Sequence, residues 1–156
     1  MIDFFKNIGY KYCGYWSRLT ENQGSIGKEL WMKYRTEETH LSNLKGPLVY
    51  IWIANGKIIY VGVSSKSVKI RMSGHESGFR GRSQSGVERQ ASILALNQNR
   101  VDVFVAFNSF FFNYLMEIKN TMISELLSPL DNDKNLAMKR EENLIIALLN
   151  PELNKR

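Results

Sequence analysis

The sequence has little of several features that define other classes of protein. It holds one cysteine, Cys13, so it can form neither an internal disulfide bond nor a zinc site built from several cysteines. It has three prolines and no apolar run near the roughly 18 residues that a membrane-spanning helix needs. The first ten residues do not have the basic segment that precedes the apolar core of a signal peptide. We therefore expect a protein of the reducing cytoplasm that makes no membrane contact.

What is present fits one compact domain with a sizeable core, because 44% of the 156 residues are hydrophobic. The formal net charge is +6, and the excess positive charge lies in the middle of the chain. Residues 46–100 contain only two acidic residues, Glu76 and Glu88. The basic residues of the same range are Lys57, Lys66, Lys69, Arg71, Arg80, Arg82, Arg89 and Arg100. This distribution favours a partner that presents phosphate groups.

Two adjacent segments are typical of a β-hairpin. Residues 48–53 are rich in β-branched and aromatic side chains, Asn55-Gly56 is a dipeptide that two-residue turns favour, and residues 57–62 repeat the strand pattern. Residues 101–107 alternate like a strand with one buried side. The fold class predicted from these segments is α+β, with a small antiparallel sheet of three strands flanked by helices.

Helices are predicted around this sheet. The predicted helices cover residues 68–75, 88–98, 114–127 and 136–149, the first of them capped by a serine within Ser64–Ser67. The polar residues 77–86 are predicted to form a loop. The stretch from Lys28 to Leu44 can be helical at its start, although its apolar spacing is irregular.

Several residues with functional side chains lie on these predicted strands and helices. Tyr50 and Tyr60 lie on the two hairpin strands, and Arg71 and His75 are four residues apart on the next helix. The last helix contains Glu141 and Glu142 and ends in the sequence Asn150-Pro151-Glu152-Leu153-Asn154. Each feature alone is common in proteins. Their occurrence together in this order and with this spacing is uncommon.

This arrangement resembles the GIY-YIG nuclease superfamily, in particular its compact restriction-type and phage-type endonucleases. The first signature corresponds to Leu48-Val49-Tyr50, with its glycine displaced to Gly46, and the second to Tyr60-Val61-Gly62. The resemblance covers residues 46–156, which we interpret as the nuclease domain. Residues 1–45 lie outside it and are interpreted as an N-terminal extension for DNA binding or oligomerisation.

The resemblance implies a catalytic set of Tyr50, Tyr60, Arg71, His75, Glu142 and Asn154. Glu142 would hold one divalent ion, Mg²⁺ or Mn²⁺, because a single carboxylate suits one hard cation that keeps several waters. The alternative Glu141 stays open from the local sequence, and the spacing to Pro151 and Asn154 favours Glu142. Arg71 would bind a phosphate oxygen through charge-assisted hydrogen bonds.

The remaining members have implied roles in positioning. Tyr50 would contact or deprotonate the attacking water and Tyr60 would position water or phosphate, although the two roles can be exchanged. His75 would orient Tyr50 or assist proton transfer. Asn154 would brace the site. The residues predicted to contact the DNA backbone are Lys66, Lys69, Arg80, Arg82 and Arg89.

The predicted function is therefore site-specific double-strand cleavage of DNA. A single active site cuts one strand, so we expect a homodimer or homotetramer on DNA. We expect no separate recognition domain after the motif, which leaves specificity to residues 1–45, to the basic segment 77–89 and to residues 101–135. The alternatives are a weakly specific or structure-selective nicking nuclease and a catalytically silent DNA-binding module.

Overall fold

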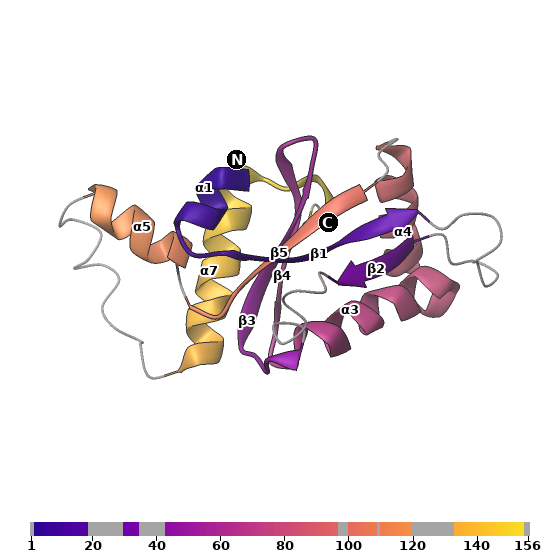
Figure 1. Ribbon diagram of the computed structural model, residues 1–156, viewed down its shortest axis with the longest axis horizontal. Coiled ribbons are helices and arrows are strands. Elements are labelled where there is room, and N and C mark those ends of the chain that lie inside the picture. The colour runs from indigo at the N-terminus through magenta and orange to yellow at the C-terminus, as the bar shows by residue number, and fades with distance from the viewer. Residues whose placement is uncertain are drawn as a thin grey trace.

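The computed structural model describes residues 2–18, 30–34, 43–96, 100–108, 110–119 and 133–154. Its centre is a five-stranded antiparallel sheet with the strand order β2-β1-β5-β3-β4 (Figure 1). The strands are β1 (Lys11–Arg18), β2 (Leu30–Tyr34), β3 (Leu48–Ala54), β4 (Lys57–Ser64) and β5 (Arg100–Ala106). The helices and helical turns are α1 (Ile2–Asn7), α3 (Val68–Ser77), the π-helical turn η2 (Gly78–Arg82), α4 (Gln84–Ala95), α5 (Phe110–Lys119), α7 (Lys134–Leu149) and the 3-10 turn η3 (Glu152–Asn154).

The predicted three-stranded sheet is wrong, because β1 and β2 extend it to five strands. The three expected strands are present as β3, β4 and β5, and β1 pairs with the free side of β5. The register between β1 and β5 shifts between Tyr12 and Gly14, so the buried residues of β1 do not fall on every second position. That shift removes the alternation by which a half-buried strand is found in a sequence.

The second missed strand, β2, lies within the stretch that was expected to start as a helix. It covers five residues and pairs with β1, so that Met32 lies opposite Trp16. Both side chains are buried in the core. Pairing with a neighbouring strand outweighs a weak local preference for helix, since β-structure depends on its partners more than helix does.

The β3-β4 hairpin is confirmed. Asn55 and Gly56 have φ values of 50° and 70°, the left-handed backbone that a tight two-residue turn between antiparallel strands requires. The register places Tyr50 opposite Gly62 and Trp52 opposite Tyr60. Because side chains alternate along a strand, these four residues lie on one face of the hairpin.

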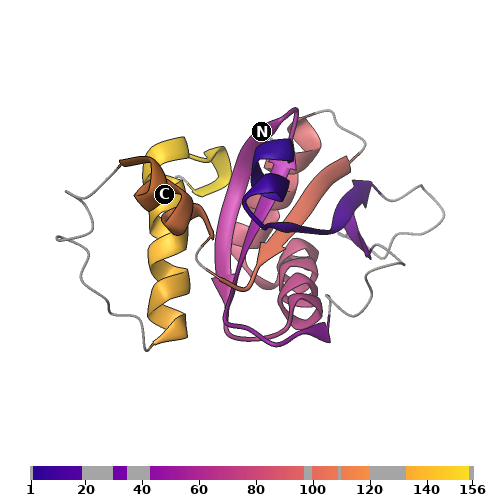
Figure 2. The ribbon, with the colours of Figure 1, turned by 60° about the vertical axis from the view of Figure 1, so that its left-hand side comes forward.

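Helices cover both faces of the sheet, and each face has its own hydrophobic cluster. Helices α3 and α4 lie on one side of the β3-β4 hairpin, whereas α7 and α5 lie on the other (Figures 1 and 2). The first cluster includes Trp52, Val103 and Met72. The second includes Ile51 and Phe104 from the strands, together with residues of α1, α5 and α7. Burial on both faces explains why every residue of β3 is buried.

The predicted helices 68–75 and 136–149 are confirmed by α3 and α7, and the helix expected over 88–98 begins earlier, at residue 84. The predicted loop 77–86 is wrong for most of its length, because η2 and the start of α4 lie there, although Gly81 (φ 89°) and the extended Ser83 interrupt the helical backbone. Ser83 caps the beginning of α4, because its side chain accepts a hydrogen bond from the backbone N–H of Gly86 at 3.1 Å. The helix expected over 114–127 corresponds to α5, and residues 120–132 lie outside the described residues. Within the described part of the chain, no helix combines the length and the apolar character that crossing a membrane requires.

Candidate active site

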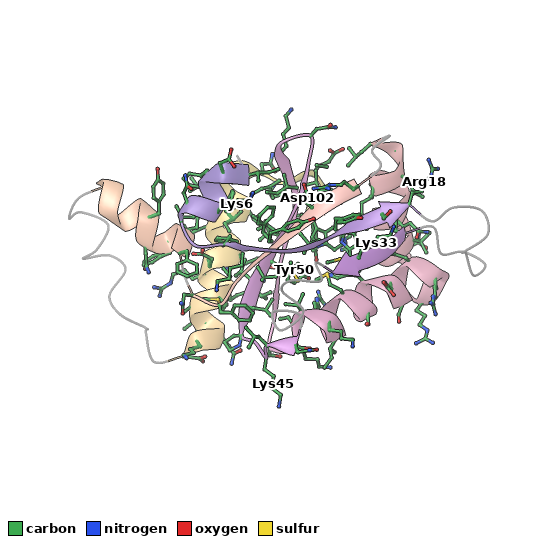
Figure 3. All side chains as sticks on the ribbon, viewed as in Figure 1. Lys6, Arg18, Lys33, Lys45, Tyr50 and Asp102 are labelled. Atoms are coloured by element: carbon green, nitrogen blue, oxygen red, sulfur yellow. The ribbon has the colours of Figure 1, made fainter. Side chains whose placement is uncertain are left out.

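The two tyrosines meet on the face of the hairpin that α3 covers. The ring centroids of Tyr50 and Tyr60 are 5.9 Å apart, and Trp52 packs against Tyr60 at 4.6 Å. The ring of His75 lies among all three, at 5.6 Å from each tyrosine and 4.8 Å from Trp52. Tyr50 lies in the middle of the molecule, whereas Lys45, just before β3, extends from its lower edge (Figure 3). The strands and α3 therefore bring Tyr50, Tyr60 and His75 into one cluster.

The hydroxyl of Tyr50 is the centre of a hydrogen-bond network. The Nε atom of Arg71 donates to this hydroxyl oxygen at 2.8 Å, and the Nε2 atom of His75 lies 2.8 Å from the same oxygen. Residues four apart on a helix share a face, which is why both side chains of α3 reach one tyrosine. On the far side of the imidazole, Nη1 of Arg89 lies 3.4 Å from Nδ1 of His75.

The direction of these hydrogen bonds follows from what each group can do. Arginine only donates, so Nδ1 of a neutral His75 accepts from Arg89 and its Nε2 carries the proton. Nε2–H then donates to the oxygen of Tyr50, which also accepts from Arg71. The ring of Tyr60 lies beside that of Tyr50, and its proximity raises the pKa of Tyr50.

Burial decides the charge of these groups. Burial and the nearby Tyr60 raise the pKa of Tyr50 well above 10.0, against the opposing effect of Arg71. Burial and the charges of Arg71 and Arg89 hold the pKa of His75 well below 6.5. Burial alone would lower the pKa of Arg71, but its tyrosine partners raise it above its ordinary value. At neutral pH the site therefore contains neutral Tyr50 and His75 between two guanidinium groups.

Tyr60, rather than Tyr50, borders a pocket. Tyr50 is 0% exposed, whereas Tyr60 is 8% exposed and lines a pocket of about 510 Å³ together with Arg89, Glu142 and Asn154. The guanidinium of Arg89 lies over the ring of Tyr60, 4.5 Å from its centroid. We call this the Tyr60 pocket. Three of the predicted site residues, Tyr60, Glu142 and Asn154, therefore line one pocket.

Asn154 reaches the site by binding the edge of the sheet. Its Oδ1 atom accepts from the backbone N–H of Val61 at 2.7 Å, and its Nδ2 atom donates to the Val61 carbonyl oxygen at 2.8 Å. Since β4 is the edge strand among the strands that the structure describes, these backbone groups face away from the sheet and are free to bind Asn154. Asn154 thereby attaches η3 to the strand that carries Tyr60.

Glu141 and Glu142 are neighbours in the chain with different surroundings. Glu141 is 0% exposed and accepts three hydrogen bonds, from the Tyr10 hydroxyl at 2.8 Å and from the backbone N–H groups of Phe111 at 2.7 Å and Phe112 at 2.8 Å. These bonds fix the beginning of α5 to α7. Glu142 instead lines the Tyr60 pocket, where its carboxylate contacts the ammonium of Lys139. The geometry favours Glu142 as the residue available for chemistry.

A second pocket lies on the other side of Lys139. It has a volume of about 530 Å³ and is lined by Arg71, Lys66 and Lys139, among others. We call it the Arg71 pocket. The predicted DNA-contacting residues Lys69, Arg80 and Arg82 are exposed, on α3 and η2. Arg89 differs from them, because it is partly buried against Tyr60 and His75.

The residues around Glu142 fit a divalent ion of one particular kind. Among the described residues, no three histidine, cysteine, aspartate or glutamate side chains gather closely enough to enclose a metal. The Tyr60 pocket is lined by the exposed carboxylates of Glu88 and Glu152, and it offers one buried carboxylate, that of Glu142. Such a donor suits Mg²⁺ or Mn²⁺ that keeps waters and binds substrate oxygens, because these ions rarely use cages made entirely of protein.

Two features of the site were missed in the sequence. Lys139 contacts Glu142 from three residues away on α7, a spacing that could have revealed it. The packing of Arg89 on Tyr60 joins α4 to β4 and leaves no local sequence signal. Comparisons of the chain with protein-family models, with curated proteins and with solved structures found no match.

Proposed function

We propose that this chain is a divalent-metal-dependent endonuclease that hydrolyses DNA phosphodiester bonds. One observation carries the proposal: Tyr60 is joined on one side to Tyr50, His75 and Arg71 and lines on the other side the pocket that contains Glu142. A hydroxyl network, two guanidinium groups and the carboxylate of Glu142, which lines the pocket, meet there. These are the groups that phosphoryl chemistry needs for positioning an attacking water and neutralising charge.

In this reaction Tyr60, not Tyr50, contacts the attacking water. Tyr50 is fully buried, and its raised pKa keeps it protonated. Its role is therefore to position the side chains of Arg71, His75 and Tyr60. Tyr60 lines the pocket and packs beside Tyr50. It can therefore orient a water or a phosphate oxygen beside it.

The two arginines bind the phosphate from either side of the tyrosine cluster. Arg71 lines one pocket and Arg89 the other. Among the described residues, the buried Nε atom of Arg89 has no hydrogen-bond partner. The Arg89 guanidinium lies over the ring of Tyr60 at the pocket, where its charge favours an anionic oxygen. A divalent ion bound to Glu142 would polarise the phosphate and the leaving oxygen. Cleavage forms a bond from the water oxygen to phosphorus and breaks the bond from phosphorus to the leaving sugar oxygen.

Supercoiled plasmid tests the proposal, with and without Mg²⁺. We expect the native protein to cut only with the metal and Glu142→Gln to cut no DNA. Glu141→Gln is the matched control, since it changes the neighbouring residue by the same atoms. It should lower the free energy of unfolding by roughly 1 to 3 kcal/mol, because an amide N–H₂ replaces an oxygen that accepts from a backbone N–H of Phe111 or Phe112, and it should still cut while folded.

The other outcomes separate the alternatives. Metal-dependent cutting that survives Glu142→Gln would contradict the role of Glu142. DNA binding by the native protein without cutting would favour a catalytically silent DNA-binding module. If the DNA is cut, sequencing the ends distinguishes restriction-type cleavage at discrete sites from the scattered ends of a weakly specific nicking nuclease.

We further propose that the protein acts as a dimer or tetramer on DNA in a reducing cytoplasm. The assembly is proposed because one site of this kind cuts one strand and a double-strand break needs two. The compartment is favoured by the presence of a single cysteine in the chain. Sedimentation of the protein with and without duplex DNA tests the assembly.

A further inference from the structure

The strongest unexplained feature is the ion pair between Lys139 and Glu142. Both residues are on α7, and the Lys139 ammonium contacts the Oε2 atom of Glu142. The side chain of Glu142 is 9% exposed, so its charge needs a nearby counter-ion, whereas that of Lys139 is 53% exposed. A divalent ion bound to Glu142 would use the same carboxylate oxygens. The ammonium and the metal therefore compete for one position.

The side chain of Lys139 can also occupy a second pocket. It lines both the Tyr60 pocket and the Arg71 pocket, so the two pockets share its side chain as a wall. The Arg71 pocket is lined further by Lys66 and by the hydroxyl-bearing Ser64 and Ser65, a set of groups that suits an anionic oxygen ligand. The flexible four-carbon stem of lysine allows its compact charged end to reach either pocket.

We propose that Lys139 is an exchangeable counter-ion that couples metal binding to DNA binding. Without metal it neutralises Glu142. With a divalent ion on Glu142, Lys139 would turn towards the Arg71 pocket and bind a DNA phosphate there together with Arg71. Metal and DNA then strengthen each other's binding through one residue, and the coupling is reciprocal. This inference rests on the proposed nuclease function and adds a residue to its DNA-binding surface.

The test measures binding rather than cleavage. Mn²⁺ affinity is measured by electron paramagnetic resonance without DNA, for the native protein, Lys139→Met and Lys134→Met. Binding of a short duplex is then followed by fluorescence anisotropy with and without Ca²⁺, in samples whose DNA is verified to be uncut. Lys134 is the matched control, because it is an exposed lysine at the start of the same helix.

Lys139→Met should bind Mn²⁺ at least about fivefold more tightly than the native protein, and in Ca²⁺ it should bind DNA weaker by a similar factor. The gain in DNA affinity that Ca²⁺ gives the native protein should be lost in this variant and kept in Lys134→Met.

Each other result has a definite meaning. If Lys139→Met binds Mn²⁺ with unchanged affinity, the proposed exchange of Lys139 is wrong. If Glu142→Gln abolishes Mn²⁺ binding in the same experiment, the metal site at Glu142 is still supported. Tighter Mn²⁺ binding with unaltered DNA binding would overturn the coupling to DNA. Mn²⁺ binding that persists in Glu142→Gln would contradict the metal site of the proposed function itself.

Discussion

Tyr50 occupies the space that a side chain on Gly62 would need. The two residues face each other across β3 and β4, and a Cβ atom built on Gly62 would lie 2.4 Å from the hydroxyl oxygen of Tyr50. The glycine of the second strand signature thus allows the tyrosine of the first to lie flat across the hairpin. Its hydroxyl is thereby held within reach of Arg71 and His75.

Gly62→Ala should therefore displace Tyr50 and break its hydrogen bonds to α3. Because this interior is closely packed, we expect a loss of about 1 to 3 kcal/mol in the free energy of unfolding, measured by urea denaturation. Gly56→Ala is the matched control for the added methyl group, since nothing lies within 4 Å of a Cβ there, although its positive φ adds a separate backbone strain. A Gly62→Ala protein with native stability and an unchanged tyrosine environment would show that the contact is unimportant.

Removing either tyrosine hydroxyl should have different effects. Tyr50→Phe leaves the buried His75 and Arg71 without their shared partner, so we expect about 1 to 3 kcal/mol of destabilisation together with loss of cleavage. Tyr60→Phe should reduce cleavage with a smaller change in stability, since Tyr60 lines a pocket and is less deeply buried than Tyr50. Urea denaturation and plasmid cutting of both variants check this. Equal losses of stability would contradict the division into a buried and a pocket-facing tyrosine.

The stability of the protein should depend on the protonation of His75. Its pKa in the folded state lies well below 6.5, so as the pH falls below about 6.5 the unfolded chain binds a proton that the folded chain does not. The stabilisation is fully present above that pH and is lost on acidification towards the folded pKa, by at most about 1.4 kcal/mol per pH unit.

The measurement compares the unfolding free energy of the native protein with that of His75→Gln between pH 7.5 and pH 5, a range chosen to span roughly the ordinary histidine pKa. Glutamine can still donate a hydrogen bond to Tyr50 but does not titrate, so the native curve should fall more steeply. Parallel curves would show that His75 is not the titrating group.

Asn154 should affect cleavage through its two hydrogen bonds to Val61 on the edge strand β4. Asn154→Asp keeps an acceptor for the Val61 N–H but loses the donor to the Val61 carbonyl oxygen and places two oxygens against each other. We expect faster hydrogen exchange at the amide of Val61 and weaker cleavage, with most of the global stability retained. Exchange measured by NMR checks this, and native protection at Val61 would contradict it.

The sequence by itself determined the parts of this molecule that are local. Asn55-Gly56 encodes the turn, because both residues tolerate the left-handed backbone, and Ser67 caps α3 with its own side chain. The four-residue spacing of Arg71 and His75 places both on one face of α3. Such features depend on neighbours in the chain, so spacing and residue type were sufficient to predict them.

Only the tertiary structure decided the rest. β1 and β2 join the sheet because β5 has a free edge that no local pattern reveals, and so three predicted strands became five. The helical position of Glu141 and Glu142 does not tell which of them meets α5 and which meets the Tyr60 pocket. The tyrosines likewise differ only through what surrounds them, since α3 buries Tyr50 completely and the pocket leaves an edge of Tyr60 open. Burial and partners far along the chain, rather than residue type, assign these roles.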